Sequence, residues 1–326
     1  MQITSRPFAG DADLHKMRQL ITDDVADASR RSYMQVGDLL WGLYQNTVFD
    51  PREHIRLWED GHGGLLGFAW FHPPSYVNWQ LHPRRRDDGR LAEEMLAWGA
   101  AHRGARLEGG DTEQLLQSNA FEDDAWRAAV LTQHGFARGD GYLLHLHRRL
   151  DHPIPEPALP AGWTVRQVAG AGEFAERVAI HREVWHPSKV TLDAYRRLRA
   201  APGYLPELDL AVVAPDGAFA AYCLCWLDPA NACGEFEPVG TRAAYRGRGL
   251  GKALMLEGLR RLQARGAESA VVYSVGGNDA AVGLYLSAGF QPGARNYDWN
   301  KRLERVPDSR PGARPIAEHG ARKQPE

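Results

Sequence analysis

Cysteine is scarce in this sequence, which holds only Cys223, Cys225 and Cys233 among its 326 residues. Three cysteines cannot build a disulfide framework, and their spacing matches no zinc-binding pattern. We expect them to be small core residues of a protein from a reducing compartment. His145 and His147 alternate on a predicted strand, but no third ligand lies at metal-site spacing, so we expect no metal.

Long apolar runs and blocks of one charge are also missing. No run approaches the roughly 18 residues of a membrane span, and the opening MQITSRPFAGDADLHKM lacks the apolar part of a signal peptide. The 39 Lys and Arg nearly balance the 41 Asp and Glu, for a net charge of −2. Neither a nucleic-acid surface nor a membrane surface is expected, and we expect a cytoplasmic protein.

The length favours two domains, because one core rarely serves so long a chain. Clustered prolines in DHPIPEPALPAGW exclude a helix and predict a linker over 151–162. Each half carries the same order of strand and helix patterns and a helix that ends in Gly-Phe. This indicates an internal duplication with a period of about 155 residues, with domains at 1–150 and 163–304. The polar tail, 305–326, is expected to be disordered.

Periodicity in the second half predicts strands and helices in a regular succession. The strands are expected near 163–168, 208–214, 218–227, 233–241, 269–275 and 294–301. The helices are expected near 171–185, 191–199, 249–265 and 279–288. This succession indicates the α/β (α+β) class, with helices packed on a central sheet.

The stretch RGRGLGKALM, 246–255, places three glycines where a strand gives way to a helix. A helix N-terminus leaves backbone N–H groups unpaired and favours negative charge, and a turn without side chains lets an anion approach. The chemistry is that of a pyrophosphate site, although a merely flexible loop is the plain alternative. Neither the dinucleotide fingerprint nor the P-loop pattern is present.

Two motifs resemble those of the GNAT superfamily of N-acetyltransferases. RGRGLG is similar to its acetyl-CoA motif, Q/R-x-x-G-x-G/A, and NDAAVGLYLSAGF, 278–290, to its second signature, N-x-x-A-x-x-x-Y-x-x-x-G-F. They lie in the family's order, about 30 residues apart. The resemblance covers 163–302 well and the first half as a degenerate copy. It implies two tandem GNAT-like domains, each a mixed, mostly antiparallel sheet flanked by helices, with acetyl-CoA as acyl donor.

The resemblance also implies which residues hold the donor. The backbone of a strand that splays from its neighbour is expected to pair with pantetheine, and the glycine turn is expected to hold the phosphates. An asparagine and a tyrosine of the second signature complete the set. The expected donor-binding residues are Val239, Gly240, Thr241, Arg246, Gly247, Arg248, Gly249, Leu250, Gly251, Lys252, Asn278 and Tyr285.

Catalysis requires a base, because an amine is mostly ammonium at neutral pH. Glu235 and Glu237 alternate on the strand before the turn and so share one face. The resemblance implies that Glu235 is the base, with Glu237 sharing the task or binding a cationic group, and that Tyr285 protonates the leaving thiolate. The plain alternatives are two solvated acids and a core tyrosine.

The first half lacks these groups. Aligned on Leu81 and Thr241, it has RRRDDGRLAEEM in place of the glycine turn, with Asp87 and Asp88 where phosphates would lie. Ser75 replaces the base, and counting back from the Gly-Phe pair puts Asp124 and Leu131 at the asparagine and tyrosine positions. We expect this domain to be non-catalytic and to complete the acceptor pocket.

The sequence therefore predicts an N-acetyltransferase that moves an acetyl group from acetyl-CoA to a primary amine of a small molecule in a ternary complex. A peptide or antibiotic-like acceptor and a longer acyl group remain open, as does a monomer or a homodimer. The alternative is a non-catalytic acyl-CoA-binding regulatory or sensor protein. Glu235 and Tyr285 favour the enzyme, because a sensor needs neither.

Overall fold

The computed structural model describes residues 3–27, 31–106 and 115–303. Its first half runs through β1 (Ile3–Pro7), α1 (Asp11–Ala26), α2 (Val36–Tyr44), α3 (Pro51–His54), β2 (Ile55–Asp60), β3 (Leu65–His72), β4 (Tyr76–Leu81), α4 (Gly89–Arg106), β5 (Leu115–Phe121), α5 (Ala125–Gln133) and β6 (Ala137–Arg149). A short 3₁₀ turn, η1 (Pro83–Arg85), joins β4 to α4.

The second half repeats this order, as the duplicated patterns predict. It runs through β7 (Thr164–Gln167), α6 (Phe174–Val184), α7 (Leu192–Arg199), β8 (Asp209–Val213), β9 (Phe219–Asp228), β10 (Cys233–Thr241), α8 (Leu250–Ala264), β11 (Ser269–Val275), α9 (Asp279–Ser287) and β12 (Gln291–Arg302). Every strand and helix predicted there is present. The proline-rich stretch before β7 forms neither helix nor strand, and the tail predicted to be disordered lies outside the described residues.

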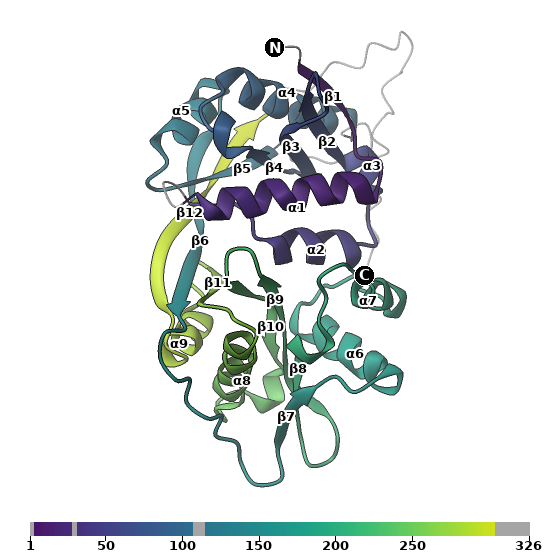
Figure 1. The fold of residues 1–326 in the computed structure, drawn as a ribbon, viewed down its shortest axis with the longest axis vertical. Coiled ribbons are helices and arrows are strands. Elements are labelled where there is room, and N and C mark those ends of the chain that lie inside the picture. The colour runs from purple at the N-terminus through teal and green to yellow at the C-terminus, as the bar shows by residue number, and fades with distance from the viewer. Residues whose placement is uncertain (1–2, 28–30, 107–114, 304–326) are drawn as a thin grey trace, which may run out of the picture.

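All strands of the described residues belong to one 12-stranded sheet, in the order β1-β2-β3-β4-β5-β12-β6-β11-β10-β9-β8-β7. Most neighbours are antiparallel, while β4 pairs with β5, and β10 with β11, in parallel. Helices flank the sheet, so the expected fold class is confirmed. Figure 1 shows the two lobes, with β6 and β12 passing between them along one side.

The sequence does not predict that the halves exchange their last strands. β12 of the second half pairs with β5 of the first, with Asn296 opposite Phe121. β6 of the first half pairs with β11 of the second, with His147 opposite Val271. Since β6 and β12 also pair with each other, neither half has a complete sheet of its own.

Helix α2 joins the halves on one face of the sheet. Its Leu39 and Leu40 are fully buried in a core that includes Leu198 of α7 and Trp226 of β9. A Cβ on Gly37 would lie 2.4 Å from the Trp226 ring, so this position admits only glycine. The N-terminal half thus lays a helix directly over the strands of the second half, and Figure 1 shows α1 and α2 between the lobes.

Two further features bear on the sequence predictions. Cys223 and Cys225 are buried in the core, and Cys233 is half-buried, as small core residues would be. Within the described residues, no helix is both long enough and apolar enough to cross a membrane.

Candidate active site

The glycine turn owes its composition to backbone conformation. Gly247 and Gly249 have φ of 74° and 76°, in the left-handed region that side chains disfavour. Gly249 is the N-cap of α8, with its carbonyl accepting from the Ala253 N–H at 3.1 Å, and it offers no side chain to cap the helix. The first N–H groups of α8 are therefore left for a ligand.

Space and charge at this turn suit an anion. A Cβ on Gly247 or Gly249 would meet nothing within 4 Å, so the turn opens to solvent. The cations beside it, Arg246, Arg248 and Lys252, are all exposed, while Leu250 anchors the helix in the core. The Arg246 guanidinium donates to the Thr241 carbonyl at 3.2 Å. The residues present fit the phosphates of a CoA thioester.

Strand β10 leaves β11 just before this turn. Their parallel pairing covers only 233–235 of β10 and 269–271 of β11, whereas β10 stays paired with β9 as far as Thr241. The register with β9 shifts between Phe236 and Val239, where three steps of β10 oppose two of β9. Along Val239, Gly240 and Thr241, the β11 side of β10 has no strand partner in the described sheet. An extended amide chain such as pantetheine could pair there.

Glu235 lies on the paired part of β10 and is 3% exposed. Neither carboxylate oxygen has a conventional donor among the described residues. Its neighbour is the Asp38 carboxyl of α2. Burial first, and then the Asp38 charge, raise the pKa of Glu235 well above its usual value.

Glu237 lies at the bulge, past the last residue of β10 that pairs with β11, and is half-buried. Burial, followed by the Asp38 charge, raises its pKa to about 8. The Glu237 charge also contributes to the raised pKa values of Tyr222 of β9 and Tyr285 of α9. Glu237 thus shares a neighbourhood with the predicted acid.

Both named residues of the second signature, 278–290, have ordinary structural roles: Asn278 caps a helix and Tyr285 is a core residue. Asn278 is the N-cap of α9, its side-chain oxygen accepting from the Ala281 N–H at 3.2 Å. Tyr285 is 6% exposed and packs in the core beside Phe290. Burial, and then Glu237, raise the pKa of Tyr285, so its phenol keeps its proton. The catalytic roles predicted for these residues stay predictions.

Sequence reasoning missed the contribution of α2. Asp38 accepts from the Gln35 N–H at 2.8 Å, which is an ordinary helix-capping contact, so no motif marks it as a site residue. The ring of Trp41, one turn on, lies 5.2 Å from that of His181 on α6. His181 Nδ1 in turn lies 2.7 Å from the Tyr222 hydroxyl. These groups form an aromatic wall beside the β10 carboxyls.

In the first half, the helix that corresponds to α8 is capped by its own chain. Asp88 occupies the N-cap of α4: its carbonyl accepts from Ala92 at 3.1 Å and its carboxylate from the Leu91 N–H at 3.2 Å. A carboxylate thus takes the place an anionic ligand would need. Ser75, where the second half has Glu235, donates to Gln117 at 2.8 Å.

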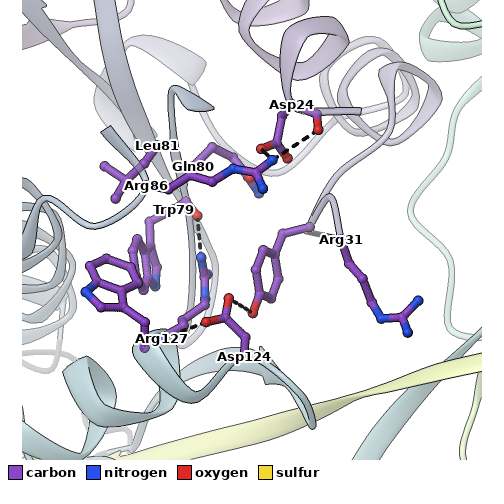
Figure 2. A pocket seen from close by; sticks show the side chains of 10 residues that line it. Asp24, Arg31, Trp79, Gln80, Leu81, Arg86, Asp124 and Arg127 are labelled. Atoms are coloured by element: carbon purple, nitrogen blue, oxygen red, sulfur yellow. Dashed lines mark hydrogen bonds and ion pairs between the residues drawn. The ribbon is translucent and has the colours of Figure 1, made fainter. Parts of the chain in front are cut away.

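The gap between β4 and β5 is filled as well. These strands pair only at Tyr76 and Gln117. Arg127 of α5 bridges the gap beyond, donating to the carbonyls of Trp79 at 3.1 Å and Asn119 at 2.8 Å, with its guanidinium 3.6 Å from the Trp79 ring centroid. Figure 2 shows Arg127 alongside Trp79, with Asp124 close by. These residues line a pocket of about 30 Å³. By the Gly-Phe count, the second half has Ala281 at this position.

Of the two histidines on the predicted face, His145 packs among aromatic rings, whereas His147 is exposed. The His145 ring lies 4.2 Å from the ring of Tyr273 and 4.6 Å from that of Phe121. Burial lowers the pKa of His145 to about 3. In the described part of the chain, no three His, Cys, Asp or Glu side chains gather as metal ligands would.

Comparison with known proteins agrees with this geometry. Residues 175–290 match the acetyltransferase (GNAT) family. Mycothiol acetyltransferase of Frankia casuarinae is 34% identical over 66% of this chain and 70% of its own, and that of Kineococcus radiotolerans is 35% identical over 76% and 80%. The second of these matches extends over three quarters of this chain and so includes parts of both halves.

Solved structures share the fold across both halves. A GCN5-related N-acetyltransferase from Sphaerobacter thermophilus has a TM-score of 0.65 at 21% identity, covering 92% of this chain and 95% of its own. A tandem GNAT protein from the clavulanic acid biosynthesis pathway has the same TM-score at 17% identity, covering 92% and 98%.

Proposed function

This chain belongs to the GNAT family of acetyltransferases, and from that premise we propose that it acetylates a primary amine of a small molecule, using acetyl-CoA, in a ternary complex. The observation that carries this proposal is that all the groups the reaction needs lie together in one region of the second half. An uncapped helix N-terminus, an unpaired strand edge, two carboxyls and a buried tyrosine all gather at the end of β10.

Each part has a task in this reaction. The turn at Gly247 and Gly249 holds the donor's phosphates, and the free edge of β10 holds its amide chain, while acetyl-CoA supplies the acetyl group as a thioester. A carboxylate on β10 takes a proton from the acceptor's ammonium, which frees the nitrogen lone pair to form the C–N bond. Tyr285 gives its proton to the sulfur as the C–S bond breaks. The second nitrogen proton restores the phenol through water, so one proton is released overall.

The surroundings of the carboxyls support an amine as acceptor. Among the described residues, no Lys, Arg or His forms an ion pair with Asp38, Glu235 or Glu237. A cation that enters this region therefore finds carboxyls that none of the described cations neutralises. The relatives are named for mycothiol, and a small amine of that kind, such as an amino sugar derivative, is the acceptor class we propose.

A screen of amines tests the proposal. Purified full-length protein is mixed with acetyl-CoA and a panel of amino sugars, cysteinyl amines, diamines and aminoglycosides, and free CoA thiol is measured. At least one small amine is expected to raise thiol release well above hydrolysis, with an acetylated product visible by mass spectrometry. Acetyl-CoA binding without turnover across the panel and with peptide amines would instead support the sensor alternative.

A further inference from the structure

We infer that Glu237, and not Glu235, takes the proton of the acceptor amine, while Asp38 of the N-terminal half seals Glu235 behind it as a positioning group. This inference rests on the proposed amine acetylation. It assigns different roles to two carboxyls, Glu235 and Glu237, that the sequence alone does not distinguish.

Glu235 is enclosed on the sides from which an amine would come. It is the last residue of β10 paired with β11, opposite Val271, so the sheet is closed at this level. Helix α2 covers it so closely that a Cβ on Gly37 would lie 2.2 Å from Glu235 Oε2. Both of its oxygens are buried. An amine could reach this carboxyl only by moving α2, whose leucines are fully buried in the joint core.

Glu237 lies where β10 no longer pairs with β11. It lies within the bulge that separates the β11-paired part of β10 from the free edge at Val239. Glu237 as a whole residue is half-buried, whereas Glu235 is buried. Glu237 is also the carboxyl whose charge reaches Tyr285, the predicted proton donor to the thiolate. A base and an acid that act on one tetrahedral centre must lie near each other, and Glu237 is the β10 carboxyl whose charge acts on Tyr285.

The charges around Glu237 favour proton transfer near physiological pH. Asp38 of α2 and Glu235 of β10 are the carboxyls that face it, and the phenols of Tyr222 and Tyr285 face it from β9 and α9. Behind Tyr222, burial lowers the pKa of His181 to about 3, so this ring stays neutral. Burial and Asp38 raise the pKa of Glu237 to about 8, close to the value at which a general base works best.

The raised pKa of Glu237 predicts how activity depends on pH. Glu237 is mostly protonated below its pKa and becomes a carboxylate as the pH rises, so kcat/KM is expected to climb through about pH 8. Removing the Asp38 charge leaves burial as the main cause of the raised pKa, so the climb should move to lower pH.

Two substitutions on one strand test the assignment. Glu237→Gln and Glu235→Gln are compared in the full-length protein, with glucosamine as probe amine and with the best amine of the screen. Glu237→Gln is expected to lower kcat by about 100-fold or more, since general bases contribute about 10²–10⁴-fold, and to flatten the climb. Glu235→Gln should lower kcat less, and its kcat/KM should still rise with pH. A large loss in Glu235→Gln with near wild-type turnover in Glu237→Gln would overturn the inference.

Asp38→Asn provides a readout that a purely structural role would not move. It should shift the climb of kcat/KM to lower pH while the melting temperature and CoA affinity stay close to wild type. An unchanged pH profile in a folded Asp38→Asn protein would contradict the part we assign to Asp38.

Infrared titration separates failure of this inference from failure of the proposed function. The C=O stretching band of protonated carboxyls is recorded as the pH is raised through 8, without any amine. A band that titrates near pH 8 should be absent from the Glu237→Gln protein and present in the Glu235→Gln protein. If no amine is acetylated, the proposed function fails, yet this titration still decides which carboxyl is open to solvent protons. A band lost only in Glu235→Gln would refute the assignment.

Discussion

At the scale of single residues, two glycines account for the motif that first marks the site. Gly247 and Gly249 hold positive φ in open space, so their value lies in backbone conformation as much as in room for a ligand. Gly251 differs, because a Cβ there would approach the Leu284 side chain at 3.1 Å. The three glycines therefore serve two purposes, helix entry and the packing of α8 on α9.

Gly249→Val is predicted to weaken acetyl-CoA binding by about tenfold or more. A side chain at positive φ costs about 1–2 kcal/mol, which tilts the turn away from the conformation that exposes the α8 N–H groups, and 1.4 kcal/mol corresponds to tenfold. Calorimetric titration with CoA measures the change, and Gly266→Val, at the other end of α8 with φ of 88°, controls for strain alone. Equal CoA affinity in both folded variants would remove the turn from the site.

At the scale of elements, the sequence predicts nearly everything that depends on local pattern. Each strand and helix from β7 to β12 follows from periodicity, and the equivalence of Asn278 and Asp124 appears as two matching N-caps. What it cannot predict is contact between distant segments. Asp38 looks like a routine capping residue, and its place over Glu235 depends on how α2 crosses β10. The strand exchange is equally hidden, since β6 and β12 each carry a pattern that suits either partner.

A comparison of α4 with α8 predicts one CoA per chain. Asp88 caps α4 and Arg127 fills the gap between β4 and β5, whereas α8 is uncapped and the edge of β10 is free. Calorimetry on the full-length protein should give a stoichiometry near one, abolished by substitutions in the second half. Asp88→Ala with Arg127→Ala tests the blocking groups directly. A second CoA per wild-type chain would show that the first half retains a working site.

At the scale of the whole molecule, the linker is not the place where the structure divides. A cut at 151–162 separates the chain into halves that each lack one strand of their sheet, because β6 belongs beside β11 and β12 beside β5. The N-terminal half also brings α2 to the carboxyls of β10. A strand and a helix supplied to the other half give the N-terminal half a structural role that does not depend on a donor site of its own.

This arrangement predicts how fragments behave. A fragment of residues 151–304 exposes the edge of β11 that β6 covers from Leu143 to Arg149, and an unpaired central edge favours aggregation. A fragment of residues 137–304 keeps β6 and β12 together, so it should be more soluble and should bind CoA. It should nevertheless turn over poorly, because it lacks Asp38 and the rest of α2. Size-exclusion chromatography, CoA calorimetry and the amine assay compare the two fragments, and fragments 1–150 and 151–304 produced together should pair and regain activity. Equal solubility of the two single fragments, with full activity in the shorter one, would mean that the second half is self-sufficient and that the exchanged strands are dispensable.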